Sequence, residues 1–182
     1  YYPEFHHKIK VIPQGFNFKE IKIPEYKKII DYPVFAYAGG FIPGRRDPRL
    51  FLKYLSTQKR EFKFYVYTSN IEILLPFKKM LNNKLEIMKP LPRDELLQVL
   101  ASMDFLVNFD NNTTEQVPSK LIDYAIVGRP ILNIKRELDI NTINEFLDGN
   151  YKNALKIDNI EKYHIENVCN AFLELCNNEF NN

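Results

Sequence analysis

The sequence predicts an α/β fold in which a doubly wound parallel sheet is covered by helices on both faces. Strand-like apolar runs alternate with helical patterns along most of the chain, and several helix ends carry capping residues. Parallel strands need a crossover between them, usually a helix, so this alternation is typical of a Rossmann-like sheet. A chain of 182 residues, 45% of them hydrophobic, can bury one sizeable core. We therefore expect one globular unit.

Apolar runs at seven places predict the strands of this sheet. They span residues 10–12, 34–38, 62–67, 85–88, 105–109, 131–134 and 154–157. The first belongs to an expected edge segment, residues 1–33, whose later part is rich in lysine and proline and reads as a connector. Residues 34–182 are expected to form the domain proper.

Patterns with apolar residues three to four positions apart predict the helices. They span residues 48–58, 70–81, 93–103, 118–127, 140–147 and 160–177. Asp47 followed by Pro48 is typical of a helix start, because aspartate caps free amides and proline fits the first helical position. Gly128 is typical of a helix end.

Charge and cysteine content exclude some classes of protein. Lys and Arg total 25 and Asp and Glu total 23, so a net charge of +2 argues against a general nucleic-acid binder. Cys169 and Cys176 would share one helical face, which favours a reducing cytoplasm over a disulfide or metal site. No apolar run is long enough for a membrane span and no signal peptide is evident. Because the chain starts without methionine, we expect a fragment of a longer protein.

Ligands of parallel sheets bind beyond the carboxyl ends of the strands, so functional residues are expected in the loops that follow the strands. The loop after residue 38 contains Gly39 and Gly40, which permit close backbone approach, and Arg45 and Arg46, which match the geometry of a diphosphate. It lacks the complete glycine patterns of dinucleotide and P-loop sites. The ordinary alternative is a simple turn.

Two further loops complete the candidate site. Residues 89–93, with Leu91 between two prolines, would form a stiff turn on which a nucleotide base can rest. A polar loop then leads into the helix at Ser119 and Lys120, whose amino end suits an anion. Asp123 lies one turn further on the same face as Ser119, and its carboxylate suits ribose hydroxyls. The ordinary alternative is that Asp123 is a solvated helix residue.

These motifs resemble those of the donor-binding, C-terminal half of a GT-B glycosyltransferase, in particular group 1, also called family 4. Residues 9–16 read IKVIPQGF and resemble the entry to that domain, and residues 34–40 resemble its first strand and loop. Residues 102–107 resemble its Ala-Asp-hydrophobic strand. Residues 115–132 read EQVPSKLIDYAIVGRPIL and resemble the Glu-x7-Glu helix, which is the most specific of these motifs.

The resemblance implies a role for each matching residue. Asp123 stands at the second carboxylate, which binds the donor ribose, and Glu115 at the first, which contacts the transferred sugar. Gln116 is the alternative for that sugar contact. The remaining matches concern the diphosphate: Ser119 and Lys120 at the helix start, Gly39 and Gly40 opposite it, and Arg45 or Arg46 as the basic partner. In this assignment Glu115, Lys120 and Arg46 are the catalytic candidates.

The resemblance also implies an activity and its partners. A retaining hexosyltransferase of polysaccharide biosynthesis would transfer a sugar from a UDP-sugar or GDP-sugar to a glycan or lipid-linked saccharide, with no cofactor or metal. The acceptor domain would be the chain's own N-terminal half, which is absent here, so we expect no turnover by this fragment. We expect a cytoplasmic protein and leave peripheral association with the inner membrane face open.

Two other interpretations remain at this point. A nucleotide-sugar 2-epimerase shares the GT-B architecture but would carry additional acid and base groups. A flavodoxin-like or receiver-like module would bind a partner without chemistry, and a receiver would need an acidic cluster at its strand ends.

Overall fold

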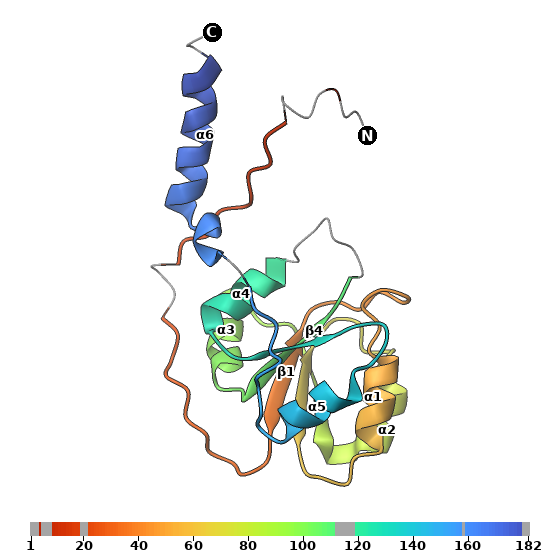
Figure 1. Cartoon of the computed structure of the whole chain (residues 1–182). Helices are drawn as coiled ribbons and strands as arrows, with labels where there is room; N and C mark the ends of the chain where they lie inside the picture. Colours follow the sequence, from red (N-terminus) through yellow and green to blue (C-terminus); the bar gives the residue numbers. More distant parts are fainter. Residues whose placement is uncertain (1–3, 5–8, 19–21, 112–118, 158, 180–182) are drawn as a thin grey trace. The chain divides into compact units, whose positions relative to one another are not determined.

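The computed structural model describes residues 4, 9–18, 22–111, 119–157 and 159–179 (Figure 1). The chain divides into two units: residues 22–157 form one, and the described parts of residues 1–21 and 158–182 form the other. This division differs from the expected boundary at residue 33. The connector belongs with the sheet because its side chains bind there, and the terminal helix belongs with the N-terminal residues.

The larger unit is built on a parallel sheet, and it confirms the predicted fold class. Its strands are β1 (Val34–Ala38), β2 (Lys63–Tyr67), β3 (Leu85–Met88), β4 (Phe105–Phe109) and β5 (Ile131–Ile134). All pair in parallel in the order β3-β2-β1-β4-β5. The chain order therefore reverses between β1 and β4, which is where open α/β sheets bind ligands beyond their carboxyl ends.

Helices cover both faces of the sheet (Figure 1). One face carries α1 (Arg49–Ser56), α2 (Leu75–Leu81) and α5 (Ile140–Leu147), with the short 3-10 helix η2 (Asn82–Lys84) following α2. The other face carries α3 (Arg93–Ala101) and α4 (Ser119–Val127), which pack against each other. Both faces are covered, so the strands read as nearly continuous apolar runs.

Stacked aromatic rings dominate the face under α1, α2 and α5. The ring of Phe35 stacks on those of Phe64 and Phe105, with centroids 4.8 and 4.4 Å away, and Phe146 of α5 meets Phe105 edge to face. All four rings are fully buried. Each such burial stabilises the fold by roughly 2 kcal/mol, so this face fixes the position of the central strands.

A buried carboxylate holds the connector at the amino end of the sheet. Asp104 accepts hydrogen bonds from the Tyr26 hydroxyl at 2.5 Å, the Lys28 amine at 3.1 Å and the Val34 amide at 2.7 Å. Arg129 donates to the Asp104 carbonyl at 3.0 Å and lies 3.6 Å over the Tyr26 ring. Burial and the Asp104 carboxylate raise the pKa of Tyr26 to about 12. We call these residues the Asp104 cluster.

The smaller unit joins the N-terminal segment to helix α6 (Ile165–Glu179), which follows the 3-10 helix η3 (Ile160–Tyr163). The Phe16 amide donates to the Tyr163 carbonyl at 2.8 Å, and the Phe16 carbonyl accepts from Ile165 at 2.9 Å. The predicted helix 160–177 is therefore interrupted at His164, whose backbone is extended. In the described part of the chain, no helix is both long and apolar enough to cross a bilayer.

Two predicted strands are wrong. Residues 10–12 lie outside any strand, and the nearest pairing is a single bridge between Phe16 and His164. Residues 154–157 follow the edge of β5 and donate one backbone bond to it, from Leu155 to Ile131 at 2.8 Å. Apolar runs that touch an element only once cannot form a hydrogen-bonded ladder.

Candidate functional site

The loop after β1, residues 39–46, is held by hydrogen bonds from three sides. We call it the glycine loop. The Gly39 amide donates to the Tyr67 carbonyl at 3.0 Å, and the Tyr37 hydroxyl donates to the Gly40 carbonyl at 2.8 Å. The Phe41 amide donates to the Asn70 side chain at 2.9 Å. The loop therefore keeps one shape at the carboxyl end of β1, where the strand order reverses.

Gly39 is required by both conformation and space. Its φ of +141° is rarely adopted by other residues, and a Cβ there would lie 3.1 Å from the Tyr37 hydroxyl and 3.9 Å from the Lys120 side chain. A side chain at this position would therefore collide with Tyr37. The residue was predicted as part of a phosphate loop, and its conformation is compatible with that role.

Helix α4 is fixed to the end of β1 by a buried tyrosine. The Ala38 amide donates to the Tyr124 hydroxyl at 2.9 Å, and burial raises the pKa of Tyr124 further above its ordinary value. The Tyr124 side chain is fully buried. Because Lys120 and Asp123 precede it on the same helix, the bond sets their distance from the glycine loop.

A cavity of about 280 Å³ opens between this loop, the ends of β2 and β3, and helices α3 and α4. We call it the Asp123 cavity. It is lined by Ala38, Gly39, Gly40, Tyr67, Thr68, Ser69, Pro90, Leu91, Leu96, Leu100, Lys120, Asp123 and Tyr124. Five of the residues predicted for a site thus line one cavity: Gly39, Gly40, Leu91, Lys120 and Asp123.

The amine of Lys120 is buried at this cavity. Its amine lies 4.4 Å over the Tyr37 ring, is buried, and has no hydrogen-bond partner in the described residues. Burial, and to a lesser extent the positive charge of Arg46, lowers the pKa of the Lys120 ammonium to about 7. The Nε atom of Arg46 is also buried without a partner in the described part of the chain.

The Tyr37 ring lies directly under the Lys120 amine. Burial raises the pKa of its hydroxyl to about 12, although the charge of Arg46 acts in the opposite direction. Tyr37 therefore stays neutral and presents the negative face of its ring to Lys120. A cation–π contact compensates only part of the free energy lost when an ammonium leaves water.

Asp123 lines the cavity from the second turn of α4. Its Oδ1 accepts from Arg93 Nε at 2.9 Å and Nη2 at 2.7 Å, and its side chain is 22% exposed. The sequence prediction did not include Arg93 among the site residues, although it stands in the loop that supplies Leu91. The pair holds the carboxylate in place beside the cavity.

The other predicted residues lie elsewhere. Arg45 lines a different cavity, whereas its neighbour Arg46 acts electrostatically on Tyr37 and Lys120. Ser119 is exposed at the first position of α4 and does not line the Asp123 cavity. Glu115 and Gln116 lie outside the described residues.

Sequence reasoning also missed Thr68 and Ser69, which line the cavity at the carboxyl end of β2. The Thr68 hydroxyl accepts from the Asn70 amide at 3.1 Å, and Asn70 in turn holds the glycine loop. The signal was present, because these residues directly follow a predicted strand and loops after strands were the places to search.

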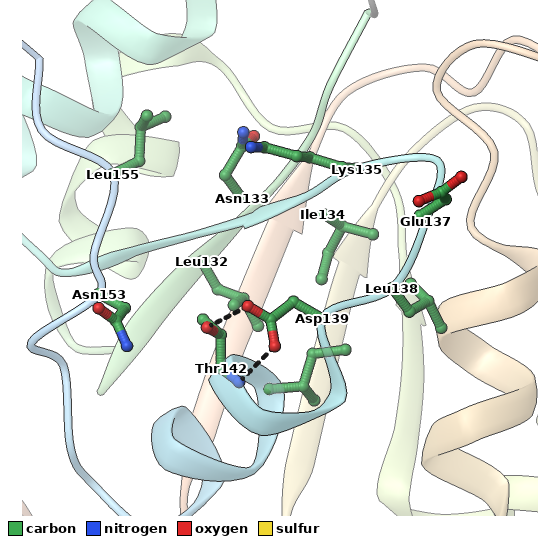
Figure 2. A pocket seen from close by; sticks show the side chains of 11 residues that line it. Leu132, Asn133, Ile134, Lys135, Glu137, Leu138, Asp139, Thr142, Asn153 and Leu155 are labelled. Carbon is green, nitrogen blue, oxygen red and sulfur yellow. Dashed lines mark hydrogen bonds between the residues drawn. The ribbon is translucent and has the colours of Figure 1, made fainter.

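Another cavity, of about 370 Å³, lies beside the carboxyl end of β5 (Figure 2). Figure 2 shows Asp139 turned toward Thr142, whose amide and hydroxyl donate to it at 3.1 and 2.8 Å. This carboxylate caps α5, and the Thr142 bonds lower its pKa. None of the predicted site residues lines this cavity, which we call the Asp139 cavity.

No protein-family model matches the chain, and no curated protein matches its sequence. The fold and the Asp123 cavity are therefore the basis for any functional conclusion.

Proposed function

We propose that this chain carries the nucleotide-sugar site of a retaining glycosyltransferase with a GT-B-like fold. The observation that carries the proposal is the buried amine of Lys120, which has no hydrogen-bond partner among the described residues and lines the same cavity as the glycine loop and Asp123. A buried charge with no counter-ion destabilises the protein by several kcal/mol, so proteins keep such charges mainly where a ligand supplies the opposite charge.

A diphosphate is the ligand that supplies this charge best. Its two negative groups match the charges of Lys120 and Arg46, and Gly39 and Gly40 let it approach the backbone. The amides in the first turn of α4 add further donors beside Lys120. A diphosphate bound there would raise the pKa of Lys120 again, because an anion favours the charged form.

The rest of the cavity suits a nucleoside. Asp123 offers a carboxylate, held by Arg93, to the hydroxyls of a ribose. Leu91 and Pro90 provide an apolar wall for a base, and the Thr68 and Ser69 hydroxyls lie at the adjoining strand end. A volume of about 280 Å³ is close to the lower end of the range for small-molecule pockets, roughly 300 to 1,000 Å³.

The proposed chemistry is transfer of the sugar to an acceptor hydroxyl. The bond from the anomeric carbon to the terminal phosphate oxygen breaks, a bond from that carbon to the acceptor oxygen forms, and the acceptor proton leaves with the phosphate. Lys120 and Arg46 stabilise the negative charge that develops on the departing diphosphate. Glu115 or Gln116 stays the proposed contact for the transferred sugar.

A thermal-shift panel tests the proposal. UDP, GDP, ADP and their sugar conjugates are added to the wild-type chain and to the variants Lys120→Ala and Asp123→Ala. We expect at least one nucleotide to stabilise the wild type, and both variants to lose most of that stabilisation. Lys152→Ala is the matched control, because Lys152 is an exposed lysine outside the three cavities. Stabilisation by none of the ligands, or equal stabilisation of all four proteins, contradicts the proposal.

A further inference from the structure

A third cavity, of about 450 Å³, lies on the other side of the glycine loop. We call it the arginine cavity. Its apolar floor is formed by Phe109, Ile134 and Leu138, at the carboxyl ends of β4 and β5 and in the turn that follows β5. The end of the glycine loop forms one wall, so Gly39 and Gly40 face one cavity while Gly44 and Arg45 face the other.

The walls of this cavity are strongly basic. Arg45, Arg49, Lys135 and Arg136 line it, and Asp47 is the single carboxylate among its lining residues. Asp47 is already bound to Arg49, with Nε–Oδ1 at 2.9 Å and Nη2–Oδ2 at 2.5 Å, and this pairing lowers its pKa. Arg45, Lys135 and Arg136 remain without an ion pair in the described residues.

One of these cations, Lys135, adds to the effect of the Thr142 bonds in lowering the pKa of the nearby Asp139 carboxylate. Glu137 and Asp139 follow on the same turn but line the Asp139 cavity, and Asp139 caps α5. Lys135 lines both cavities, and in Figure 2 its amine lies beside Asn133. The arginine cavity therefore holds three positive charges in excess of its carboxylate.

The backbone presents Arg45 to the cavity in a fixed loop. The Arg45 amide donates to Ile42 at 3.0 Å, the Ile42 amide donates to Arg46 at 3.2 Å, and the Asp47 amide donates to Arg45 at 3.0 Å. Gly44 allows the turn, with φ of +78°. As a result, Arg45 lines this cavity, whereas the charge of the next residue, Arg46, acts on Tyr37 and Lys120.

We propose that the arginine cavity binds the phosphoryl group of a second substrate, the acceptor, whose remaining part would be held by the expected N-terminal half. This step rests on the proposed function, in which Lys120 and Arg46 already hold the donor diphosphate. A planar guanidinium matches a phosphoryl group bidentately, and the apolar floor suits the carbon face of a sugar or a hydrocarbon next to it. Both cavities open at the carboxyl edge of the sheet, so donor and acceptor phosphates are held on opposite sides of one loop.

Inorganic pyrophosphate is the probe. Its binding is measured by the chemical-shift changes of backbone amides in NMR spectra. Lys120→Ala is the background, so that binding at the donor site is weakened. In this background we compare two double variants. The test variant combines Lys135→Glu and Arg136→Glu. The matched control combines Lys59→Glu and Lys152→Glu, at exposed lysines outside all three cavities. We expect shifts at residues 44–47 and 135–138, and about tenfold weaker binding in the double reversal alone.

Other outcomes overturn the proposal. Equal pyrophosphate affinity in the double reversal and its control, or shifts confined to residues 39–40 and 119–123, would show that the cavity binds no phosphoryl group. In the wild-type background the double reversal should leave nucleotide stabilisation unchanged, and loss of that stabilisation would make the cavity part of the donor site. If no nucleotide binds but pyrophosphate binding depends on Lys135 and Arg136, the donor assignment fails and the anion site stands.

Vesicles distinguish a soluble source of the phosphoryl group from a lipid. Phosphatidylcholine vesicles with and without phosphatidic acid are sedimented with the wild type, the double reversal and the control. Co-sedimentation that requires both phosphatidic acid and the two basic residues assigns a lipid phosphate, whereas pyrophosphate binding without it assigns a soluble acceptor. The absence of both responses would overturn the proposal.

Discussion

The two ends of the sheet treat buried charge in opposite ways. At the amino end, the Asp104 carboxylate is 5% exposed and has a hydroxyl, an amine and an amide as partners. At the carboxyl end, the Lys120 ammonium is buried with no hydrogen-bond partner among the described residues. Both sites have a charged group next to a tyrosine, so the neighbouring ring does not explain the difference in hydrogen-bond partners.

The difference separates a structural use of charge from a functional one. A charge with a full set of partners fixes the connector on the sheet and leaves nothing for a ligand to add. A charge without partners destabilises the unliganded protein. Binding of an anion offsets this destabilisation. The comparison leads to three predictions, in which stability and binding respond in opposite ways.

The largest loss of stability is expected for Asp104→Ala. Removal of the carboxylate leaves the Val34 amide and the Tyr26 hydroxyl without their acceptor, and we expect a loss of about 3 kcal/mol in the free energy of unfolding. Urea unfolding measures this loss. Nucleotide-induced thermal shifts of the folded variant should persist, because the Asp104 cluster lies at the opposite end of the sheet. A loss below about 1 kcal/mol would remove the contrast between the two ends.

The second prediction concerns Lys120→Met, which should stabilise the unliganded protein. The pKa of Lys120 is about 7 in the folded state and 10.5 as its ordinary value, so the unfolded chain binds more protons between these limits. The wild type therefore gains stability as the pH rises from 7 toward 10.5. The destabilisation by the charged lysine is complete below pH 7.

Urea unfolding of Lys120→Met and wild type at pH 7 and pH 9 measures this effect. The advantage of the variant should shrink by roughly 2 kcal/mol between these two pH values. Lys152→Met, at an exposed lysine, is the control and should show no such change. The variant should also lose nucleotide binding, and an advantage that is constant with pH would speak against a depressed pKa.

The smallest effect on stability is expected for Arg93→Ala. The pair with Asp123 is partly exposed, at 39% and 22%, and contributes about 0.5 kcal/mol. Nucleotide affinity should nevertheless fall severalfold, because Asp123 is no longer held beside the cavity. Arg60→Ala removes a comparable ion pair with Asp148 and should change stability alike without changing nucleotide affinity. Equal affinity in the two variants would show that Arg93 does not position Asp123.

The sequence predicted most of the fold because each parallel strand is a continuous apolar run. Four of the strands begin and end where predicted, and β2 differs by one residue at its start. The helix expected at 70–81 begins only at Leu75, because Asn70 is used to hold the glycine loop instead. Local periodicity cannot show such a tertiary contact.

The location of the site could be predicted from the sequence, but the contacts among its residues could not. The rule about strand ends brought Gly39, Leu91 and Asp123 together from three separate segments. It could not separate Arg45 from Arg46, because adjacent residues diverge only once the loop takes its shape. The partner of Asp123 also depended on how α3 and α4 pack.

The hydrogen bonds that hold the glycine loop affect how tightly a ligand can bind. The protein's own residues Tyr67, Tyr37 and Asn70 hold the loop by hydrogen bonds. Its conformational entropy was therefore lost on folding, and binding need not order it again. Differences in affinity among nucleotides should then reflect how each base and sugar fits the walls, rather than how much chain each has to rearrange.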